Sequence, residues 1–245
     1  MDKLIIGNWK MRPTTRGEAE ALARASDAAG VVVAPPFPFL DVASRIITRA
    51  ALAVQNVFSE DPEGGGAYTG EVSCAMARAM GARYAIIGHS ERREYLRESD
   101  AMIAKKVSAA IAAGLTPVLC VGEKKEVRDK GSDAARVFVE TQLLADLTLI
   151  RGSAEVIVAY EPVWAIGTGD NATPEVASAM SEMIRTTVAK NFPALNIRVL
   201  YGGSVSEENI ASFAAERRID GFLVGGASAK AAEFAKMITT VRELQ

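Results

Sequence analysis

Eight short apolar runs, each followed by a longer stretch of helical character, limit the possible folds of this chain most strongly. The runs are continuously apolar and rich in β-branched residues, which is typical of parallel strands buried on both faces. Their C-terminal ends follow one another at intervals of 22 to 41 residues, enough for a crossover helix and a strand. The runs cover residues 4–6, 31–33, 52–54, 84–87, 118–121, 156–159, 199–200 and 222–224.

The segments between these runs carry signals for helix starts and stops. Thr15, with Glu18 three residues later, predicts a capping box. Thr173 before Pro174 predicts a second helix start, and Ser206 with two following acids predicts a third. Three glycines stand where helices should end before the next strand, at Gly30, Gly81 and Gly114.

The chain shows no sign of a division into domains. No Pro/Ser-rich linker or low-complexity stretch interrupts its 245 residues. Eight βα units in one undivided domain most simply close on themselves, so we expect residues 1–245 to form a single α/β domain, a (β/α)₈ barrel with a parallel eight-stranded core. An open, doubly wound sheet of similar length is the alternative.

Composition excludes several function classes. The net charge of −2 argues against a nucleic-acid partner or an anionic membrane surface. The single histidine, His89, excludes multi-histidine zinc sites. Cys74 and Cys120 form no CxxC pair, which favours a reducing, cytoplasmic compartment. No run reaches the roughly 18 apolar residues of a membrane span. We therefore expect no metal, no nucleic acid and no membrane.

Polar residues follow several of the predicted strands. Parallel α/β folds bind ligands at the C-terminal ends of their strands. Asn8 and Lys10 follow the first run, His89 the fourth and Glu161 the sixth. The sequence thus predicts that the only histidine, a lysine and a carboxylate converge on one face of the barrel. The alternatives are that Lys10 is a solvated lysine, His89 a structural histidine and Glu161 an exposed glutamate.

The surroundings of His89 and Glu161 favour proton-transfer chemistry. His89 stands where a turn leads into a helix, whose N-terminal partial charge favours the neutral imidazole. A neutral ring can donate to one oxygen and accept a proton from another. Pro162 holds Glu161 extended at a strand end, and the neighbouring Tyr160 and Trp164 could exclude water from the carboxylate.

Two kinds of loop complete the predicted site. The segment 162–169 carries apolar side chains between a proline and Gly-Thr-Gly, which indicates a lid, although a loop packed under other structure is equally consistent. Glycine turns at 202–204 and 225–226 follow the last two runs. Such turns let backbone N–H groups approach an anion, and barrels often bind phosphate there.

Motifs along the whole chain resemble those of the triosephosphate isomerase family, in the order found in that family. The resemblance runs from Leu4 to the final helix, and the string around the predicted lid is its most specific part. It implies the (β/α)₈ architecture known as the TIM barrel. The matching motifs are residues 8–11, 88–93, 159–169, 201–205 and 221–228.

The resemblance implies interconversion of dihydroxyacetone phosphate and glyceraldehyde 3-phosphate through a cis-enediolate, in glycolysis and gluconeogenesis, without metal or organic cofactor. By resemblance, Glu161 is the base, and His89 polarises the carbonyl and relays protons. Lys10 offsets negative charge, while Asn8 donates a hydrogen bond and Glu91 supports the site through Lys10. The residues implied to hold the phosphate are Gly167, Ser204, Gly225 and Gly226.

The resemblance also implies a homodimer. The 63–71 loop resembles the protruding loop that enters the neighbouring subunit in this family, with Thr69 at its tip bracing the partner's site. Residues 55–56 resemble part of the site wall beneath it. The alternative is a glycine-rich loop with no partner, which would leave Tyr68 as an exposed aromatic side chain.

Departures from the family pattern and two other functions remain to be weighed. Residues 170–171 stand where the family more often has a lysine, and segments 12–15 and 124–132 look like peripheral variation. A different phosphate-binding barrel enzyme, such as one of tryptophan or histidine biosynthesis, would keep the glycine turns without His89, Lys10 and the lid together. A non-enzymatic descendant would be free to lose these residues.

Overall fold

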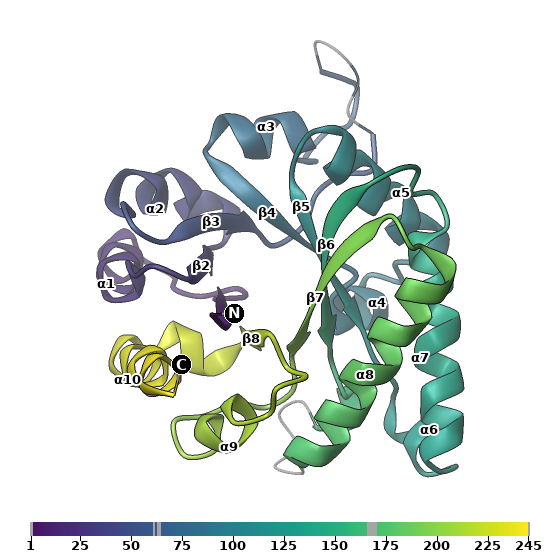
Figure 1. Ribbon diagram of the computed structural model, residues 1–245. Coiled ribbons are helices and arrows are strands. Elements are labelled where there is room, and N and C mark those ends of the chain that lie inside the picture. The colour runs from purple at the N-terminus through teal and green to yellow at the C-terminus, as the bar shows by residue number, and fades with distance from the viewer. Residues whose placement is uncertain (1, 61, 63–64, 166–170, 245) are drawn as a thin grey trace.

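The eight predicted strands form a closed parallel barrel in the order of the chain. The computed structural model describes residues 2–60, 62, 65–165 and 171–244. Strand β1 pairs with both β2 and β8, which closes the sheet and confirms the barrel over the open alternative (Figure 1). The strands are β1 (Leu4–Asn8), β2 (Val31–Ala34), β3 (Ala51–Val54), β4 (Ala82–Ile87), β5 (Thr116–Val121), β6 (Ala154–Tyr160), β7 (Leu195–Tyr201) and β8 (Gly221–Val224).

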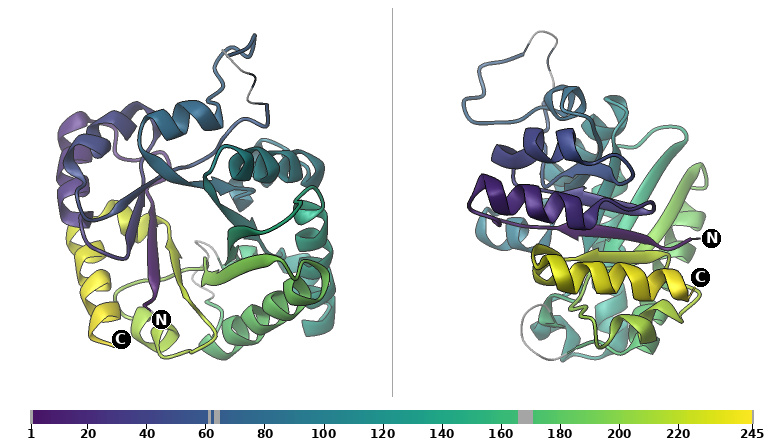
Figure 2. Two further views of the ribbon diagram at one scale, coloured as in Figure 1. Left: turned by 45° about the horizontal axis from the view of Figure 1, so that its top comes forward. Right: turned by 90° about the vertical axis from the view of Figure 1, so that its left-hand side faces the viewer.

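Helices surround the barrel on its outer face (Figures 1 and 2). The α-helices are α1 (Arg16–Ser26), α2 (Leu40–Ile46), α3 (Cys74–Ala79), α4 (Ser90–Tyr95), α5 (Asp100–Ala112), α6 (Lys125–Arg128), α7 (Ser132–Leu147), α8 (Pro174–Asn191), α9 (Ile210–Ala214) and α10 (Ala231–Glu243). Short 3₁₀ turns are η1 (Phe37–Phe39), η2 (Val163–Ala165) and η3 (Gly226–Ala229). In the described part of the chain, no helix combines the length and apolar character of a membrane span.

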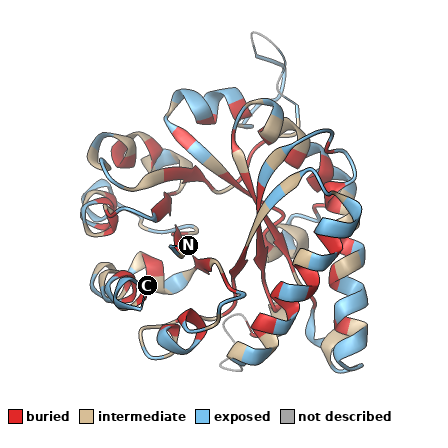
Figure 3. Ribbon diagram, in the orientation of Figure 1, coloured by how far each residue is buried: buried red, intermediate tan, exposed pale blue. Residues whose placement is uncertain are grey.

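Burial on both faces explains why the strands read as continuous apolar runs. Successive side chains of a strand point to opposite faces. In β1, Leu4 and Ile6 belong to the cluster inside the barrel, whereas Ile5 belongs to the layer between strands and helices. Figure 3 shows the buried residues concentrated on the strands and on the inner sides of the helices. Neither face of a strand therefore tolerates a polar pattern.

Most of the predicted helix boundaries are confirmed. Thr15 forms a complete capping box with Glu18, and Thr173 caps α8. The predicted helix stops at 30, 81 and 114 are glycines with φ of 72°, 87° and 75°, a conformation that favours glycine. The start predicted at Ser206 is wrong, because residues 207–209 form a turn in which the Ser206 carbonyl accepts the Asn209 N–H at 3.3 Å, and α9 begins only at Ile210.

Candidate active site

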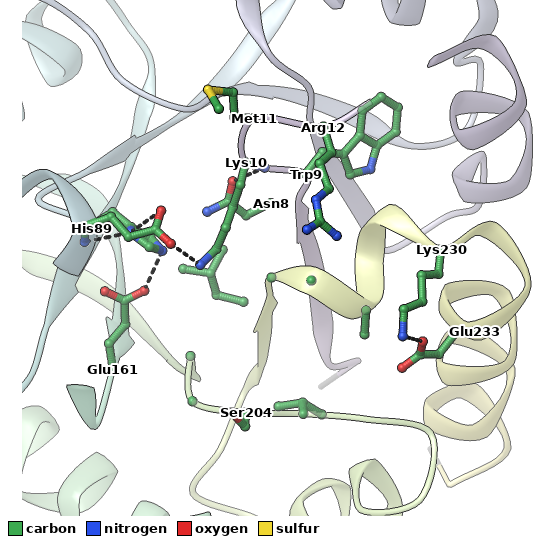
Figure 4. A pocket seen from close by; sticks show the side chains of 18 residues that line it. Asn8, Trp9, Lys10, Met11, Arg12, His89, Glu161, Ser204, Lys230 and Glu233 are labelled. Atoms are coloured by element: carbon green, nitrogen blue, oxygen red, sulfur yellow. Dashed lines mark hydrogen bonds and ion pairs between the residues drawn. The ribbon is translucent and has the colours of Figure 1, made fainter. Parts of the chain in front are cut away.

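A cavity of about 620 Å³ opens at the C-terminal ends of the strands (Figure 4). It brings together all the described residues predicted for the site. Gly167, the remaining one, lies outside the described residues. The predicted residues that line the cavity are Asn8, Lys10, His89, Glu91, Glu161, Ser204, Gly225 and Gly226.

The alternation of side chains along the strands places these residues at the mouth. In β6, Ile157 and Ala159 point into the barrel, and two residues further the same face presents Glu161. In β1, the same step from Ile6 leads to Asn8. The register of the apolar core therefore sets the direction of the polar groups above it.

Lys10 is held in an unusual backbone conformation. Its φ is 54°, a left-handed value that persists in a non-glycine residue only where surrounding contacts fix it. The Gln55 side chain donates to the Lys10 carbonyl at 2.7 Å and to the Ala34 carbonyl at 2.8 Å, and the Lys10 N–H donates to Asn8 Oδ1 at 3.1 Å. Lys10 Nζ lies 2.5 Å from Glu91 Oε1. These contacts fix the ammonium at the cavity wall.

The hydrogen bonds of His89 determine its tautomer. His89 is the N-cap of α4, and its Nδ1 accepts the Glu91 backbone N–H at 3.2 Å. A ring nitrogen that accepts carries no proton, so a neutral ring must hold its proton on Nε2. Nε2 lies 3.1 Å from Glu161 Oε1. The imidazole therefore points an N–H into the cavity, as an electrophile for a carbonyl oxygen requires.

Glu161 is a buried carboxylate with both oxygens engaged. Its exposed fraction is 2 %, and Oε2 accepts the Ser90 N–H at 2.9 Å while Oε1 faces His89. The Glu161 backbone N–H donates to the Val121 carbonyl at 2.8 Å, which ties it to β5. At the residue after Val121, a Cβ on Gly122 would lie 1.7 Å from the Glu161 carbonyl oxygen. Only glycine leaves room for the Glu161 backbone at this point.

Only the first part of the predicted lid is described, since Ile166, Gly167, Thr168 and Gly169 lie outside the described residues. Trp164 Nε1 donates to Glu123 Oε1 at 2.8 Å, and the Tyr160 hydroxyl donates to the same carboxylate. Burial raises the pKa of Glu123. The Ser204 hydroxyl donates to the Ala165 carbonyl at 2.7 Å. The lid itself remains a prediction.

The glycine turn after β8 borders the same cavity. Gly226 begins η3, and a Cβ there would have no atom within 4 Å, whereas a Cβ on Gly225 would lie 3.1 Å from Lys10 Cε. The first N–H groups of such a helical turn lack partners within the turn and are suited to an anion. The turn thus presents backbone donors close to the Lys10 side chain.

Several supporting residues were missed in the sequence. Gly122 follows a strand, so its position gave a usable signal, but its contact with Glu161 did not show. Gln55 was expected in the site wall by resemblance, but its bonds to the Lys10 and Ala34 carbonyls were not. The position of Arg93 within the 88–93 motif gave no signal for its contacts. Arg93 donates to the Gly88 carbonyl at 2.7 Å, to the Cys120 carbonyl at 3.0 Å and to buried Asp146 at 2.5 Å. These bonds hold the turn before His89 against β5.

Comparison with known proteins agrees with this geometry. The triosephosphate isomerase family matches residues 3–241. The triosephosphate isomerase of Caldanaerobacter subterraneus subsp. tengcongensis is 44 % identical over 96 % of this chain and 98 % of its own, and that of Chloroflexus aurantiacus is 46 % identical over 96 % and 97 %. The triosephosphate isomerase of Thermus thermophilus is 42 % identical over 96 % and 97 %. Barrel, cavity and whole-length similarity together show that the chain belongs to the triosephosphate isomerase family.

Proposed function

We propose that this protein interconverts dihydroxyacetone phosphate and D-glyceraldehyde 3-phosphate in glycolysis and gluconeogenesis. The observation that carries the proposal is the meeting of a buried carboxylate, an imidazole N–H and an ammonium in one cavity of a family member. Family membership over the whole chain does not favour another phosphate-binding barrel enzyme or a non-enzymatic descendant.

The proposed reaction begins with proton removal from the carbon next to the carbonyl. The Glu161 carboxylate takes this proton, the electron pair moves onto the carbonyl oxygen, and a cis-enediolate forms. The Nε2–H of His89 donates to the oxygen that gains charge, and the Lys10 ammonium offsets that charge electrostatically. Return of the proton to the neighbouring carbon, with proton relay between the oxygens through His89, gives the isomer.

The contacts of Glu161 with His89 and Ser90 indicate which hydrogen bonds the substrate must displace. Glu161 Oε1 now accepts from His89, and Oε2 accepts from the Ser90 N–H. Neither group can act on substrate until these bonds are exchanged for bonds to it. We propose that substrate binding turns His89 Nε2–H toward the carbonyl oxygen and frees a Glu161 oxygen to face the carbon. Asn8 would donate to the substrate from the cavity wall, and Glu91 would hold Lys10 in place.

An enzyme-coupled assay with glyceraldehyde 3-phosphate tests the proposal. We expect turnover by the wild-type protein and a fall in kcat of at least about 100-fold for Glu161→Gln, since a positioned base contributes about 10²–10⁴-fold. Binding of a phosphate-bearing substrate analogue should be largely retained. Glu155→Gln, on the same strand at an exposed position, is the matched control and should keep full activity. Undiminished turnover in Glu161→Gln would contradict the assignment of the base.

We also propose that Ser204, Gly225 and Gly226, with Gly167, hold the phosphate. Support comes from the open turn at Gly226 and from the place of Ser204 on the same cavity wall. Inorganic phosphate should therefore inhibit competitively. Inhibition that is not competitive with substrate would contradict this placement.

A homodimer through the 63–71 loop is a further part of the proposal. The described residues of this loop project from the barrel (Figure 2), and Tyr68 packs on Phe58 with ring centroids 4.7 Å apart while 45 % of it stays exposed. Met11 is 90 % exposed and Tyr95 77 %. Such exposed apolar side chains are typical of a subunit interface. Sedimentation equilibrium should give twice the 26.0 kDa chain mass, and a monomer would contradict the proposal.

A cytoplasmic location completes the proposal. Cys74 and Cys120 are both buried, and neither is in a disulfide, which suits a reducing compartment. Cell fractionation of the source organism should recover the protein with the cytoplasmic fraction.

A further inference from the structure

The side chain of Arg12 lines the cavity beside the residues already described. The sequence indicated only peripheral variation at residues 12–15, and the structure shows that this is wrong for Arg12. The chain turns after β1 at the left-handed Lys10 and brings Arg12 back to the cavity wall. Figure 4 shows the side chains of Lys10 and Arg12 pointing toward the cavity.

The charges of the cavity wall balance, which is unexpected in a site for a dianion. The charged side chains that line the cavity are Lys10, Arg12, Lys230, Glu91, Glu161 and Glu233. Lys10 is paired with Glu91 at 2.5 Å, and Lys230 is paired with Glu233 at 2.8 Å. These two cations are therefore neutralised locally. With a neutral His89, the remaining charges are the Glu161 carboxylate and the Arg12 guanidinium.

Among the described residues, Arg12 is the cation of this wall that forms no ion pair or hydrogen bond through its guanidinium. Throughout residues 2–60, 62, 65–165 and 171–244, no side chain or carbonyl pairs with its guanidinium. It lies within electrostatic reach of Lys230, the residue directly after η3, so an anion at this end of the cavity would also relieve the repulsion between two cations. A guanidinium presents a planar fork of donors that matches two phosphate oxygens.

We infer that Arg12 is a further substrate-binding residue, which contacts the phosphate group from the side opposite to Ser204 and sets the preference for phosphorylated over unphosphorylated substrates. The inference rests on the proposed function, because it assigns Arg12 to the phosphate of that substrate. It differs from the roles of Lys10 and the glycine turns, since those groups face the reacting carbons or offer neutral N–H donors. Arg12 would supply a positive charge that no nearby carboxylate of the described residues neutralises by pairing, as a dianion needs.

The test compares Arg12→Met with Arg12→Lys and with the control Arg16→Met. Arg16 carries the same charge on the same connecting segment but lies outside the cavity lining. Loss of a charge-assisted contact should raise KM for glyceraldehyde 3-phosphate about 10-fold or more in Arg12→Met, with kcat nearly unchanged. Turnover of glyceraldehyde, which lacks the phosphate, should be unaffected. Arg12→Lys should recover part of the affinity, and Arg16→Met should match the wild type.

Calorimetric titration with inorganic phosphate separates the inference from the proposed function. Weaker phosphate binding by Arg12→Met than by Arg16→Met supports the inference. If the wild type binds phosphate but does not isomerise triose phosphates, the proposed function fails while this comparison still measures the role of Arg12 in anion binding. Equal phosphate affinity and equal KM in Arg12→Met and Arg16→Met would overturn the inference, because Arg12 would then be a solvated surface residue.

Discussion

Replacing Gly122 by alanine should displace Glu161, the proposed base, without removing any polar group of the site. A Cβ at this position would lie 1.7 Å from the Glu161 carbonyl oxygen and 2.5 Å from its carbonyl carbon. Real Cβ contacts essentially never fall below 3.0 Å. The difference between 3.0 and 1.7 Å means that the Glu161 peptide must move by about 1.3 Å relative to β5. A flexible side chain could yield to the methyl group at little cost, whereas movement of this peptide disturbs its hydrogen bond to Val121.

This displacement of the Glu161 peptide determines the expected loss of catalytic rate. The Glu161–His89 contact is 3.1 Å, so a shift of this size is large compared with the tolerance of the pair. A misplacement of about 1 Å typically costs about 100-fold in rate. We therefore expect kcat for Gly122→Ala to fall about 100-fold, with a smaller change in KM. Overpacking should also lower the free energy of unfolding by about 1–3 kcal/mol.

Steady-state kinetics and urea denaturation should be measured on three variants together. Gly202→Ala would place its Cβ 3.0 Å from Glu161 Cγ and 3.3 Å from the Tyr160 carbonyl oxygen, which asks for a shift of only a few tenths of an ångström, so its loss of kcat should be smaller. Gly17→Ala, with no atom within 4 Å in α1, should keep full activity and gain about 0.5–1 kcal/mol of stability. If Gly122→Ala retains wild-type kcat, the reasoning from backbone contact is refuted.

Two further predictions concern residues that support the site. Burial raises the pKa of Asp146 to about 7 in spite of its ion pair with Arg93. The folded state therefore holds a proton that the unfolded chain releases near pH 4. The free energy of unfolding should fall by about 4 kcal/mol as pH rises from about 4 to 7. Urea denaturation should show that Asp146→Asn removes this fall, and an equal pH dependence in both proteins would contradict the assignment. Gln55→Met removes the two hydrogen bonds donated to the Lys10 and Ala34 carbonyls, so kcat/KM should drop about 10-fold, while a thermal melt shows a folded protein. Kinetics equal to wild type would show that Lys10 keeps its conformation without these bonds.

Much of the fold could be predicted because the barrel imposes a periodic pattern on the sequence. Strands buried on both faces are apolar over most of their length, and closure requires one helix-sized segment between neighbours. The C-terminal strand ends then identify Asn8, His89 and Glu161 as neighbours, although long stretches of sequence separate them. The boundary at Ser206 could not be predicted, because a serine followed by acids is equally typical of a turn, and residues 207–209 form one before α9 begins.

The supporting contacts could not be predicted for a different reason. Gly122 matters through its distance to a peptide of the neighbouring strand, and Arg93 through carbonyls of β5 and the turn before α4. Arg12 directly follows a motif of the site, but only the structure shows that its guanidinium shares the cavity with Lys10 and pairs with none of the described residues. Such pairings depend on the register between strands, which a periodic pattern does not specify.

Incorporation of solvent deuterium tests the central claim most directly, namely that the Glu161 carboxylate removes a carbon-bound proton. Dihydroxyacetone phosphate is incubated with the protein in D₂O, and NMR follows deuterium at the carbon next to the carbonyl. The wild type should incorporate deuterium during turnover, because a proton held by a carboxylate exchanges with solvent. In Glu161→Gln the rate should fall by at least about 100-fold while Glu155→Gln matches the wild type. Deuterium incorporation at the wild-type rate in a folded Glu161→Gln protein would contradict the account.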